Sequence, residues 1–501
     1  MRTLSLVLLI IVSVFLFCCK SEPDKEKTNV IGQNIDWVHQ VDSLLMPFWM
    51  TDEAYGEPLG NFPNYRYNDG SIISYDNFDF SSIPVPLTEF LITQPDSLRR
   101  NYIRMNSRQV YSYCVAYHIT GNEEYLIRAK TGVDYLLKYG GYDTGSPYTY
   151  WQEGKGMPNK FQSTTQDLAY SLTGPTMYYY LTRDIDVLNQ ILKVKNYVIT
   201  EYYENSEVKD KTKLVAWVKK DFENDVKTSK RLLAVLDQLN AYLVLLTPIL
   251  PDTLSNTFLE DIKSLGYSLK DNFYDEKHNL FWMDLDRKVI RDYQTDFGHS
   301  IKSFWMLYII GNLTQDHELS QFAKENALKL LETAYLDESG SWAERYIDST
   351  LTIEKSTSWW SYAELDQMTA TLSLQDTILY SKYLKQTYNY WGQNIIDHEN
   401  KEVYFSIDEE GNPVDLGLKT CHWKNGFHSL EHALIGFLST HNYNDEDINL
   451  YYAFEKNKFP EERKIKPYYY DGKIKSKSVT TFGTSMFNKL SKVKVTFEKI
   501  K

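Results

Sequence analysis

Two histidines stand at the start of apolar helical segments, each beside aromatic and basic side chains. His299 lies in TDFGHSIKSFWML (295–307), and His428 follows Trp423 in KTCHWKNGFHSLEHAL (419–434). An indole offers a flat apolar face to a sugar ring, and an imidazole titrates near neutral pH. Each segment alone could equally be a structural aromatic loop before an ordinary helix. Because the chain contains two such segments, we interpret them as parts of one site.

Helical periodicity predicts the elements that must position these residues. It occurs in six successive pairs of segments, which are joined by loops that contain Gly, Pro, Asn or Asp. Short strand-like runs, such as NLFWMDL (279–285) and EVYFSID (402–408), lie between some pairs. Six helical hairpins predict an all-α toroid of twelve helices. The pairs are 98–118 with 123–138, 164–181 with 185–203, 228–247 with 256–273, 297–311 with 318–335, 359–373 with 376–396, and 427–440 with 446–456.

Composition and net charge limit the classes of molecule that the protein is expected to bind. The net charge of -13 over 501 residues argues against nucleic acid, because phosphate binding requires a basic surface. Aromatic residues make up 15% of the chain, an enrichment that often accompanies carbohydrate contact, although most of these rings must pack between helices. The segment 461–501 differs, with 11 Lys and Arg against four Asp and Glu. We predict a solvated basic tail there; contact with acidic glycans or lipid headgroups, or a small β appendage, are alternatives.

The first 18 residues predict a lipoprotein signal peptide. The apolar run 4–17 is about 14 residues long, shorter than the ~20 that span a membrane. It ends in LFCCKSEPDKEK, which resembles a bacterial lipoprotein cleavage site, so we expect lipidation of Cys19 and a polar tether at 19–34. The protein would then be lipid-anchored in the bacterial cell envelope, facing the periplasm or the cell surface, without crossing the membrane. Secretion after simple cleavage is the alternative.

Cysteine and histidine usage predicts no metal. Beyond the signal region only Cys114 and Cys421 remain, which is too few for a disulfide framework. A bond between them and two separate buried thiols are equally compatible with the sequence. The ten histidines include no HExxH pattern, and the chain has no CxxC, so we predict neither a structural nor a catalytic metal.

Four ordered segments resemble the N-acylglucosamine 2-epimerase and cellobiose 2-epimerase superfamily over about residues 35–456. Members of this superfamily are (α/α)6 barrels that epimerise or isomerise free reducing sugars without a redox cofactor. The resemblance therefore implies such a barrel at 35–460, a carbohydrate substrate, no cofactor, and a monomer or homodimer. One Gly-His motif would be weak evidence, but four motifs at matching intervals are specific. The segments are RMNSRQVYSYCVAYHITGNEEYLIRAKTGVDYLLKYGG (104–141), DFGHSIKSFWML (296–307), SWWSYAELDQM (358–368) and YFSIDEEGNPVDLGLKTCHWKNGFHSLEHAL (404–434).

The resemblance also assigns a proton-transfer pair. His299 and His428 match the two acid/base histidines of the family. Inverting the carbon beside a sugar carbonyl requires one group to remove its proton and another to return a proton on the opposite face, through an enediolate. Arg108 matches an arginine near the sugar oxygens, where a fixed positive charge would stabilise that enediolate. Taken alone, Arg108 could be a surface charge and His299 a helix cap.

The remaining matches are substrate contacts. Trp359, Trp360 and Trp423 match sugar-stacking positions, and Glu364 matches a hydrogen-bonding carboxylate, although it could instead pair with a neighbouring lysine. The polar residues on the first helix of each pair, chosen partly with the family in mind, recur at steps of 58, 71, 62, 65 and 64 residues, as helical-hairpin repeats would produce. These residues are Arg108, Gln166, Asp237, His299, Glu364 and His428.

Three positions depart from the family's pattern. Lys302 stands where the family commonly has the glutamate of a Gly-His-x-x-Glu motif. Asp237 and Asn240 stand where it has the histidine and glutamate of a His-x-x-Glu motif. Glu431 stands where it frequently has arginine. We include Lys302, Asp237 and Asn240 among the substrate contacts, and the basic Lys302 motivates the hypothesis of an acidic sugar such as a uronate.

Two other functions remain open from the sequence. One is a glycoside hydrolase on the same barrel with Asp237 and Glu364 as its carboxyl pair, and the other is a carbohydrate-binding lipoprotein that has lost catalysis. The sequence also leaves open whether the family reaction would be epimerisation or aldose–ketose isomerisation.

Overall fold

The computed structural model describes residues 35–74, 78–83, 85–157, 164–205, 213–218, 230–285, 295–347 and 350–501. The predicted signal peptide at 1–18, the lipidation site Cys19 and the tether at 19–34 lie outside these residues. Residues Asp36–Lys501 pack as one unit, so the predicted boundary at 460 does not separate two bodies.

Six inner helices form a closed ring. Each packs against the next along the chain, and the last packs against the first. They are buried on almost every face, which is why they lack a single apolar stripe. The segment Leu232–Ile249 has the length and hydropathy of a membrane span, but 89% of it is buried inside the protein, as in a core helix. The inner helices are α5 (Ile103–Thr120), α7 (Thr165–Thr182), α9 (Leu232–Gln238) with its continuation α10 (Val244–Leu246), α12 (Phe297–Leu313), α14 (Trp359–Ser373) and α17 (Phe427–Tyr443).

The outer helices bury only one stripe each. In α13, buried residues recur every three or four positions, from Leu319 through Ala323 to Ala334. Asn and Asp side chains accept the first backbone N–H groups of three outer helices, which satisfies donors that the helix itself leaves unpaired. The five helical pairs predicted between 98 and 396 are therefore confirmed. The outer members are α6 (Glu123–Tyr139), α8 (Ile185–Tyr202), α11 (Asp252–Ser268), α13 (His317–Ala334), and α15 (Thr377–Leu379) continuing into α16 (Lys385–Tyr390).

The twelfth helix comes from the other end of the chain. The helix predicted at 446–456 is wrong, because Ile448–Glu455 is the strand β15. Instead, the helical segment that runs from α1 (Trp37–His39) to α2 (Met46–Trp49) packs on α17. The Trp37 indole donates to Thr440 Oγ1 at 2.9 Å. A Cβ on Gly436 would lie 2.2 Å from the Trp37 ring, so glycine permits this close approach.

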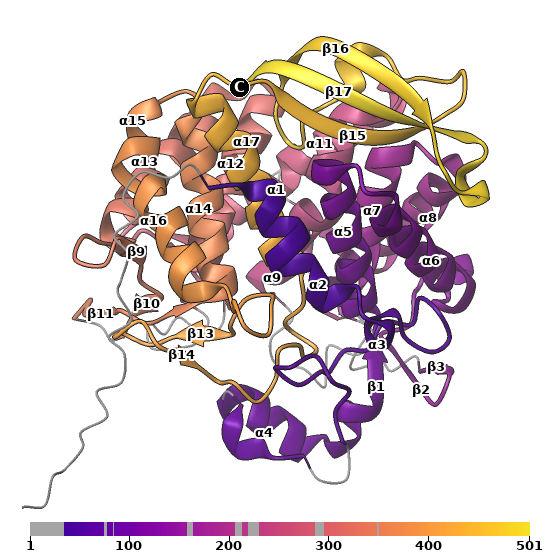
Figure 1. Cartoon of the computed structure of the whole chain (residues 1–501). Coiled ribbons are helices and arrows are strands. Elements are labelled where there is room, and N and C mark those ends of the chain that lie inside the picture. Colours follow the sequence, from indigo (N-terminus) through magenta and orange to yellow (C-terminus); the bar gives the residue numbers. More distant parts are fainter. Residues whose placement is uncertain are drawn as a thin grey trace, which may run out of the picture. The chain divides into compact units, whose positions relative to one another are not determined.

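A three-stranded antiparallel sheet follows α17. Its order is β15 (Ile448–Glu455), β17 (Leu490–Ile500), β16 (Gly472–Thr481). Successive residues of β17 alternate between buried and partly exposed, so one face of the strand is apolar and the lysines lie on the other. The sheet packs on helices α5 and α7 through β15 (Figure 1).

Both remaining cysteines are buried free thiols. Cys114 lies in α5 and Cys421 in the loop before α17, and the two are not bonded to each other. Burial raises the pKa of each thiol above its ordinary value. Of the two alternatives that the sequence left open, two separate thiols is therefore the one observed.

Candidate active site

Most of the predicted site residues come from the N-terminal halves of the inner helices, and Trp423 lies in the loop before α17. His299 is in the first turn of α12, Trp359 and Trp360 begin α14, and His428 follows the first residue of α17. A Cβ on Gly298, beside His299, would lie 2.6 Å from the Trp360 ring. The glycine of the Gly-His motif therefore allows α12 and α14 to meet closely at the site.

Asp296 supports His299. It is the N-cap of α12: its Oδ1 accepts the backbone N–H of His299 at 2.6 Å, and its Oδ2 lies 2.8 Å from the imidazole Nδ1. Burial tends to raise the pKa of Asp296, but the charge and hydrogen bonds of His299, with the charge of Arg345, outweigh it and lower this pKa. Asp296 therefore stays ionised and fixes Nδ1 as the donor nitrogen. Among the described residues, Nε2 of His299 has no hydrogen-bond partner.

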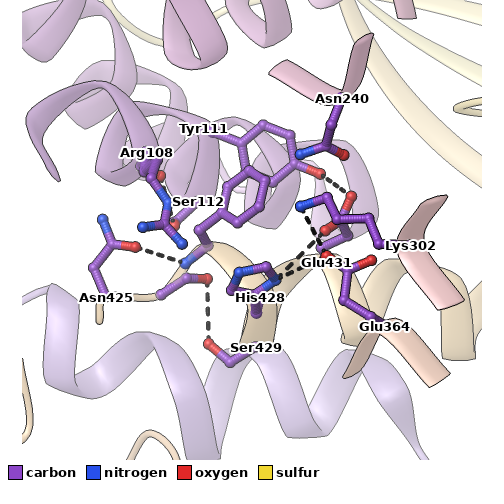
Figure 2. Close-up of polar contacts among 12 residues, drawn as sticks. Arg108, Tyr111, Ser112, Asn240, Lys302, Glu364, Asn425, His428, Ser429 and Glu431 are labelled. Atoms are coloured by element: carbon purple, nitrogen blue, oxygen red, sulfur yellow. Dashed lines mark hydrogen bonds and ion pairs between the residues drawn. The ribbon is translucent and has the colours of Figure 1, made fainter. Parts of the chain in front are cut away.

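His428 has a different environment. It is buried, and its Nδ1 lies 3.6 Å from Glu364 Oε1 and 4.0 Å from Glu431 Oε2 (Figure 2). Burial lowers the pKa of His428 well below its ordinary value, and the positive charges of Arg108 and Lys302 lower it further. The imidazole is therefore neutral at neutral pH, and its Nε2 has no hydrogen-bond partner in the part of the chain that the structure describes.

Lys302 and Glu364 form a buried ion pair. Their Nζ and Oε1 atoms are 3.0 Å apart, and both side chains are at most 4% exposed. Burial tends to lower the pKa of Lys302, but the carboxylates of Glu364, Asp237 and Glu431 outweigh it and raise this pKa. Burial raises the pKa of Glu364, while Lys302 lowers it in part. The basic exchange at position 302 is thus compensated within the protein, and Glu364 pairs with a lysine as one reading of the sequence anticipated.

Glu431 completes this charge network. It accepts a hydrogen bond from the Tyr468 hydroxyl at 2.5 Å and a longer one from Tyr111 at 3.4 Å. Burial raises the pKa of Glu431 to about 7, and the nearby Glu364 adds to the effect. Glu364, His428 and Glu431 hold donor atoms within 4.8 Å of one another, a spacing that metal ligands also have. Because the Lys302 ammonium already supplies a cation there, we assign these residues to the charge network.

Arg108 is buried and carries a charge that no carboxylate of the described residues pairs with. Its Nη1 donates to the carbonyl of Trp423 at 3.0 Å, and its guanidinium lies 5.0 Å from the Tyr170 ring centroid and 4.9 Å from that of Phe427. Among the described residues Arg108 forms no ion pair. Because arginine stays protonated even when burial lowers its pKa, the guanidinium remains a fixed positive charge rather than a surface one.

Asp237 and Asn240 lie on the third inner helix. Asp237 accepts hydrogen bonds from Gln166 at 2.8 Å and from the Tyr170 hydroxyl at 3.0 Å, so its carboxylate is occupied by neighbours. The Asn240 side chain is 5% exposed, and its amide Nδ2 has no hydrogen-bond partner among the described residues. A buried donor without a partner is costly, so this amide is a candidate hydrogen-bond donor.

The three tryptophans have different surroundings. The Trp360 ring centroid lies 4.5 Å from that of His299 and 6.3 Å from that of His428, so this indole lies beside both imidazoles. Trp359 is buried edge-on against Phe405. The Trp423 ring packs with Phe90 and His422 in an aromatic cluster, and its carbonyl holds Arg108.

Sequence reasoning missed three members of the site. Asp296 could have been found, because an aspartate three residues before His299 is a typical helix N-cap. Tyr111 lies one helical turn after Arg108 and therefore on the same face of α5. No sequence pattern pointed to Tyr468, because it reaches the site from the segment between β15 and β16.

A separate cavity of about 100 Å³, lined among others by Tyr308 and Lys501, lies at the opposite ends of α12 and α14.

Comparisons with known proteins are consistent in fold and family. Residues 93–430 match the model of the family described as N-acylglucosamine 2-epimerase (GlcNAc 2-epimerase). A cellobiose 2-epimerase of Dictyoglomus turgidum (strain DSM 6724 / Z-1310) is 25% identical over 410 residues, which cover 78% of this chain and 95% of the relative.

Solved structures share the barrel. The cellobiose 2-epimerase from Bacillus thermoamylovorans B4167 has a TM-score of 0.61 at 17% identity, covering 80% of this chain and 97% of that one. A D-mannose isomerase has a TM-score of 0.59 at 16% identity, covering 80% and 95%. At these identities the structures establish the fold, an (α/α)6 barrel, as the sequence predicted.

Proposed function

The chain belongs to the N-acylglucosamine 2-epimerase family and is a sugar epimerase or isomerase; on this premise we propose that His428 and His299 transfer the proton beside the carbonyl of a reducing sugar. The observation that carries the proposal is the different environment of the two imidazoles. His428 is buried with a pKa well below its ordinary value, so it rests as a neutral base. Nδ1 of His299 lies 2.8 Å from the ionised Asp296, and a carboxylate in that position would stabilise positive charge on the imidazole during the reaction. We therefore assign His428 as the base and His299 as the acid.

The reaction follows from these two states. In the open-chain sugar, Nε2 of His428 removes the proton from the carbon beside the carbonyl, and the electron pair of the C–H bond moves into an enediolate. The negative charge then lies on oxygen, where Arg108 stabilises it and the Asn240 amide donates to a hydroxyl. Return of a proton by His299 to the opposite face of the same carbon gives the epimer. Return of a proton to the former carbonyl carbon gives the ketose.

The substrate that the site supports best is a neutral reducing sugar. Trp360 offers an apolar ring beside both histidines, against which a sugar ring stacks. The hypothesis of an acidic sugar rested on Lys302, but its ammonium is 3.0 Å from Glu364 and is surrounded by further carboxylates. Lys302 therefore offers no uncompensated charge to a sugar carboxylate.

Glycoside hydrolysis has less support. An acid and a carboxylate would have to act on the glycosidic oxygen and the anomeric carbon. Asp237 is held by Gln166 and Tyr170, and Glu364 by Lys302.

We also propose, from the sequence of the first residues, that lipidation of Cys19 anchors the activity in the bacterial cell envelope.

Incubation with candidate sugars in heavy water distinguishes these functions. Cellobiose, mannose and glucuronate are each incubated with the protein and followed by NMR. We expect deuterium beside the carbonyl of a neutral sugar and the appearance of its epimer or ketose. New reducing ends without deuterium would instead indicate hydrolysis, and binding without either change would indicate a protein that has lost catalysis. Faster turnover of glucuronate than of the neutral sugars would contradict the assigned substrate class.

A further inference from the structure

Three consecutive tyrosines of the C-terminal segment enter the ring of inner helices. Tyr468, Tyr469 and Tyr470 lie between β15 and β16, outside the residues 93–430 that match the family model. Tyr468 and Tyr470 are buried. The Tyr469 ring packs edge-on against Trp305 of α12, with centroids 4.9 Å apart, and the Tyr470 hydroxyl lies 2.9 Å from Thr371 Oγ1 of α14. The segment therefore contacts the inner helices from inside the unit rather than extending as a tail.

Tyr468 connects this segment to the proposed base. Its hydroxyl donates to Glu431 Oε1 at 2.5 Å and lies 2.6 Å from the Tyr111 hydroxyl. The other oxygen of Glu431, Oε2, lies 4.0 Å from Nδ1 of His428. The backbone of Tyr468 is itself held, because its N–H donates to the Tyr180 hydroxyl at 2.8 Å. The Tyr468 hydroxyl thus holds one carboxylate oxygen of Glu431. The second oxygen lies on the side of the His428 imidazole (Figure 2).

We propose that the C-terminal segment completes the active site, with Tyr468 as a positioning residue that holds Glu431 against Nδ1 of His428. This inference rests on the proposed role of His428 as a base. When Nε2 accepts a proton, the imidazole becomes positively charged, and carboxylates on the Nδ1 side stabilise that charge. Asp296 lies within hydrogen-bond distance of Nδ1 of His299, whereas Glu364 at 3.6 Å and Glu431 at 4.0 Å act on Nδ1 of His428 through their charge. Of these two, Glu431 is held by Tyr468, 37 positions later in the chain.

The charge state of Glu431 gives the proposal a measurable signature. The hydrogen bonds from Tyr468 and Tyr111 lower the pKa of Glu431, whereas burial and Glu364 raise it, with a result of about 7. Removal of the Tyr468 hydroxyl therefore raises the pKa of Glu431 further, and the carboxylate is protonated at a higher pH. The titratable and charged groups that face Glu431 are Tyr468, Tyr469 and, without a hydrogen bond, Tyr470 of the C-terminal segment, Tyr111 of α5, Lys302 of α12, Glu364 of α14 and His428 of its own helix.

The test compares Tyr468→Phe with Tyr470→Phe in the full mature chain. Both changes remove one buried hydroxyl from the same segment, but the Tyr470 hydroxyl bonds to Gln367 and Thr371 and not to Glu431. For Tyr468→Phe we expect a roughly tenfold lower kcat, little change in KM and an acidic limb of the pH–rate profile that moves to higher pH. Tyr470→Phe should keep the wild-type profile. An unchanged acidic limb in a folded Tyr468→Phe protein would overturn the inference.

A second variant keeps the inference testable if Tyr468→Phe does not fold. Glu431→Gln preserves the shape of the side chain but cannot carry the charge, so kcat should fall by a similar factor and the Glu431 contribution to the acidic limb should disappear. A wild-type kcat and profile for Glu431→Gln would also overturn the inference. If His428→Ala is inactive while Tyr468→Phe and Glu431→Gln behave as wild type, only the role of the C-terminal segment fails. If His428→Ala keeps wild-type activity, the proposed function fails instead.

Discussion

The two proposed acid/base residues differ in how the protein builds their surroundings. His299 receives its carboxylate from Asp296, three positions earlier and at 2.8 Å from Nδ1. His428 has two carboxylates at 3.6 and 4.0 Å, and these are set by a lysine on another helix and a tyrosine from the C-terminal segment. One environment is local in sequence, and the other exists only in the folded barrel. Changes near His299 should therefore affect chemistry with little loss of stability, whereas changes near His428 should affect both.

The largest effect is expected for Lys302→Met. This change leaves Glu364 buried without its partner, which typically costs about 3–5 kcal/mol of folding stability. Urea unfolding should show most of that loss, and the double variant Lys302→Met/Glu364→Gln should recover a large part of it, because no buried charge then remains unpaired. A single variant that is as stable as the wild type would show that this side of the site does not depend on the pair.

Arg108→Gln should act on catalysis and on His428 together. Loss of the guanidinium should lower kcat about 10²- to 10³-fold, because the enediolate loses its fixed positive charge. The charge of Arg108 also lowers the pKa of His428, so its removal raises that pKa, and the acidic limb of the pH–rate profile should move to higher pH. Arg128→Gln is the matched control, since Arg128 donates to backbone carbonyls of Met50 and Thr51. A similar loss of activity in both variants would contradict the assigned role.

Asp296→Asn should lower activity with little loss of stability, unlike changes near His428. Asparagine caps a helix about as well as aspartate, so the melting temperature should change little. The amide cannot stabilise the imidazolium, and kcat should fall by about 10²-fold. Asp184→Asn, the same change at the N-cap of α8, is the control for capping, because Asp184 accepts the backbone N–H groups of Asp186 and Val187. If Asp296→Asn lost stability rather than activity, the carboxylate would serve only the helix.

The same difference between local and assembled structure explains what the sequence could predict. Five helical pairs were predicted because the outer helices carry a clear apolar stripe and the inner helices are long segments bounded by turn residues. The twelfth helix was missed because Trp37–Trp49 is short and contains Pro47 near its end, and because INLYYAFE at 448–455 reads equally well as a helix or a strand until its pairing with β17 is known.

The site follows the same rule. His299, His428 and Arg108 came from motifs, and a lysine partner for Glu364 was one alternative. That this lysine is Lys302 was not predicted, because the two residues lie on different inner helices. Tyr468 could not be predicted, because its contact with Glu431 depends on the C-terminal segment entering the ring. Sugar stacking by Trp423 stays a prediction; the packing of its ring with Phe90 and the hydrogen bond from Arg108 to its carbonyl were not predicted.

The most direct test is hydrogen exchange in heavy water with the two single variants, starting from each of two C2 epimers that the wild type interconverts. We predict that His299→Ala exchanges the C2 proton of only one epimer, that His428→Ala exchanges that of only the other, and that neither forms the opposite epimer. His441→Ala, at the far end of α17, should behave as the wild type. Conversion of one epimer to the other at the wild-type rate by either single variant would contradict proton transfer between His428 and His299.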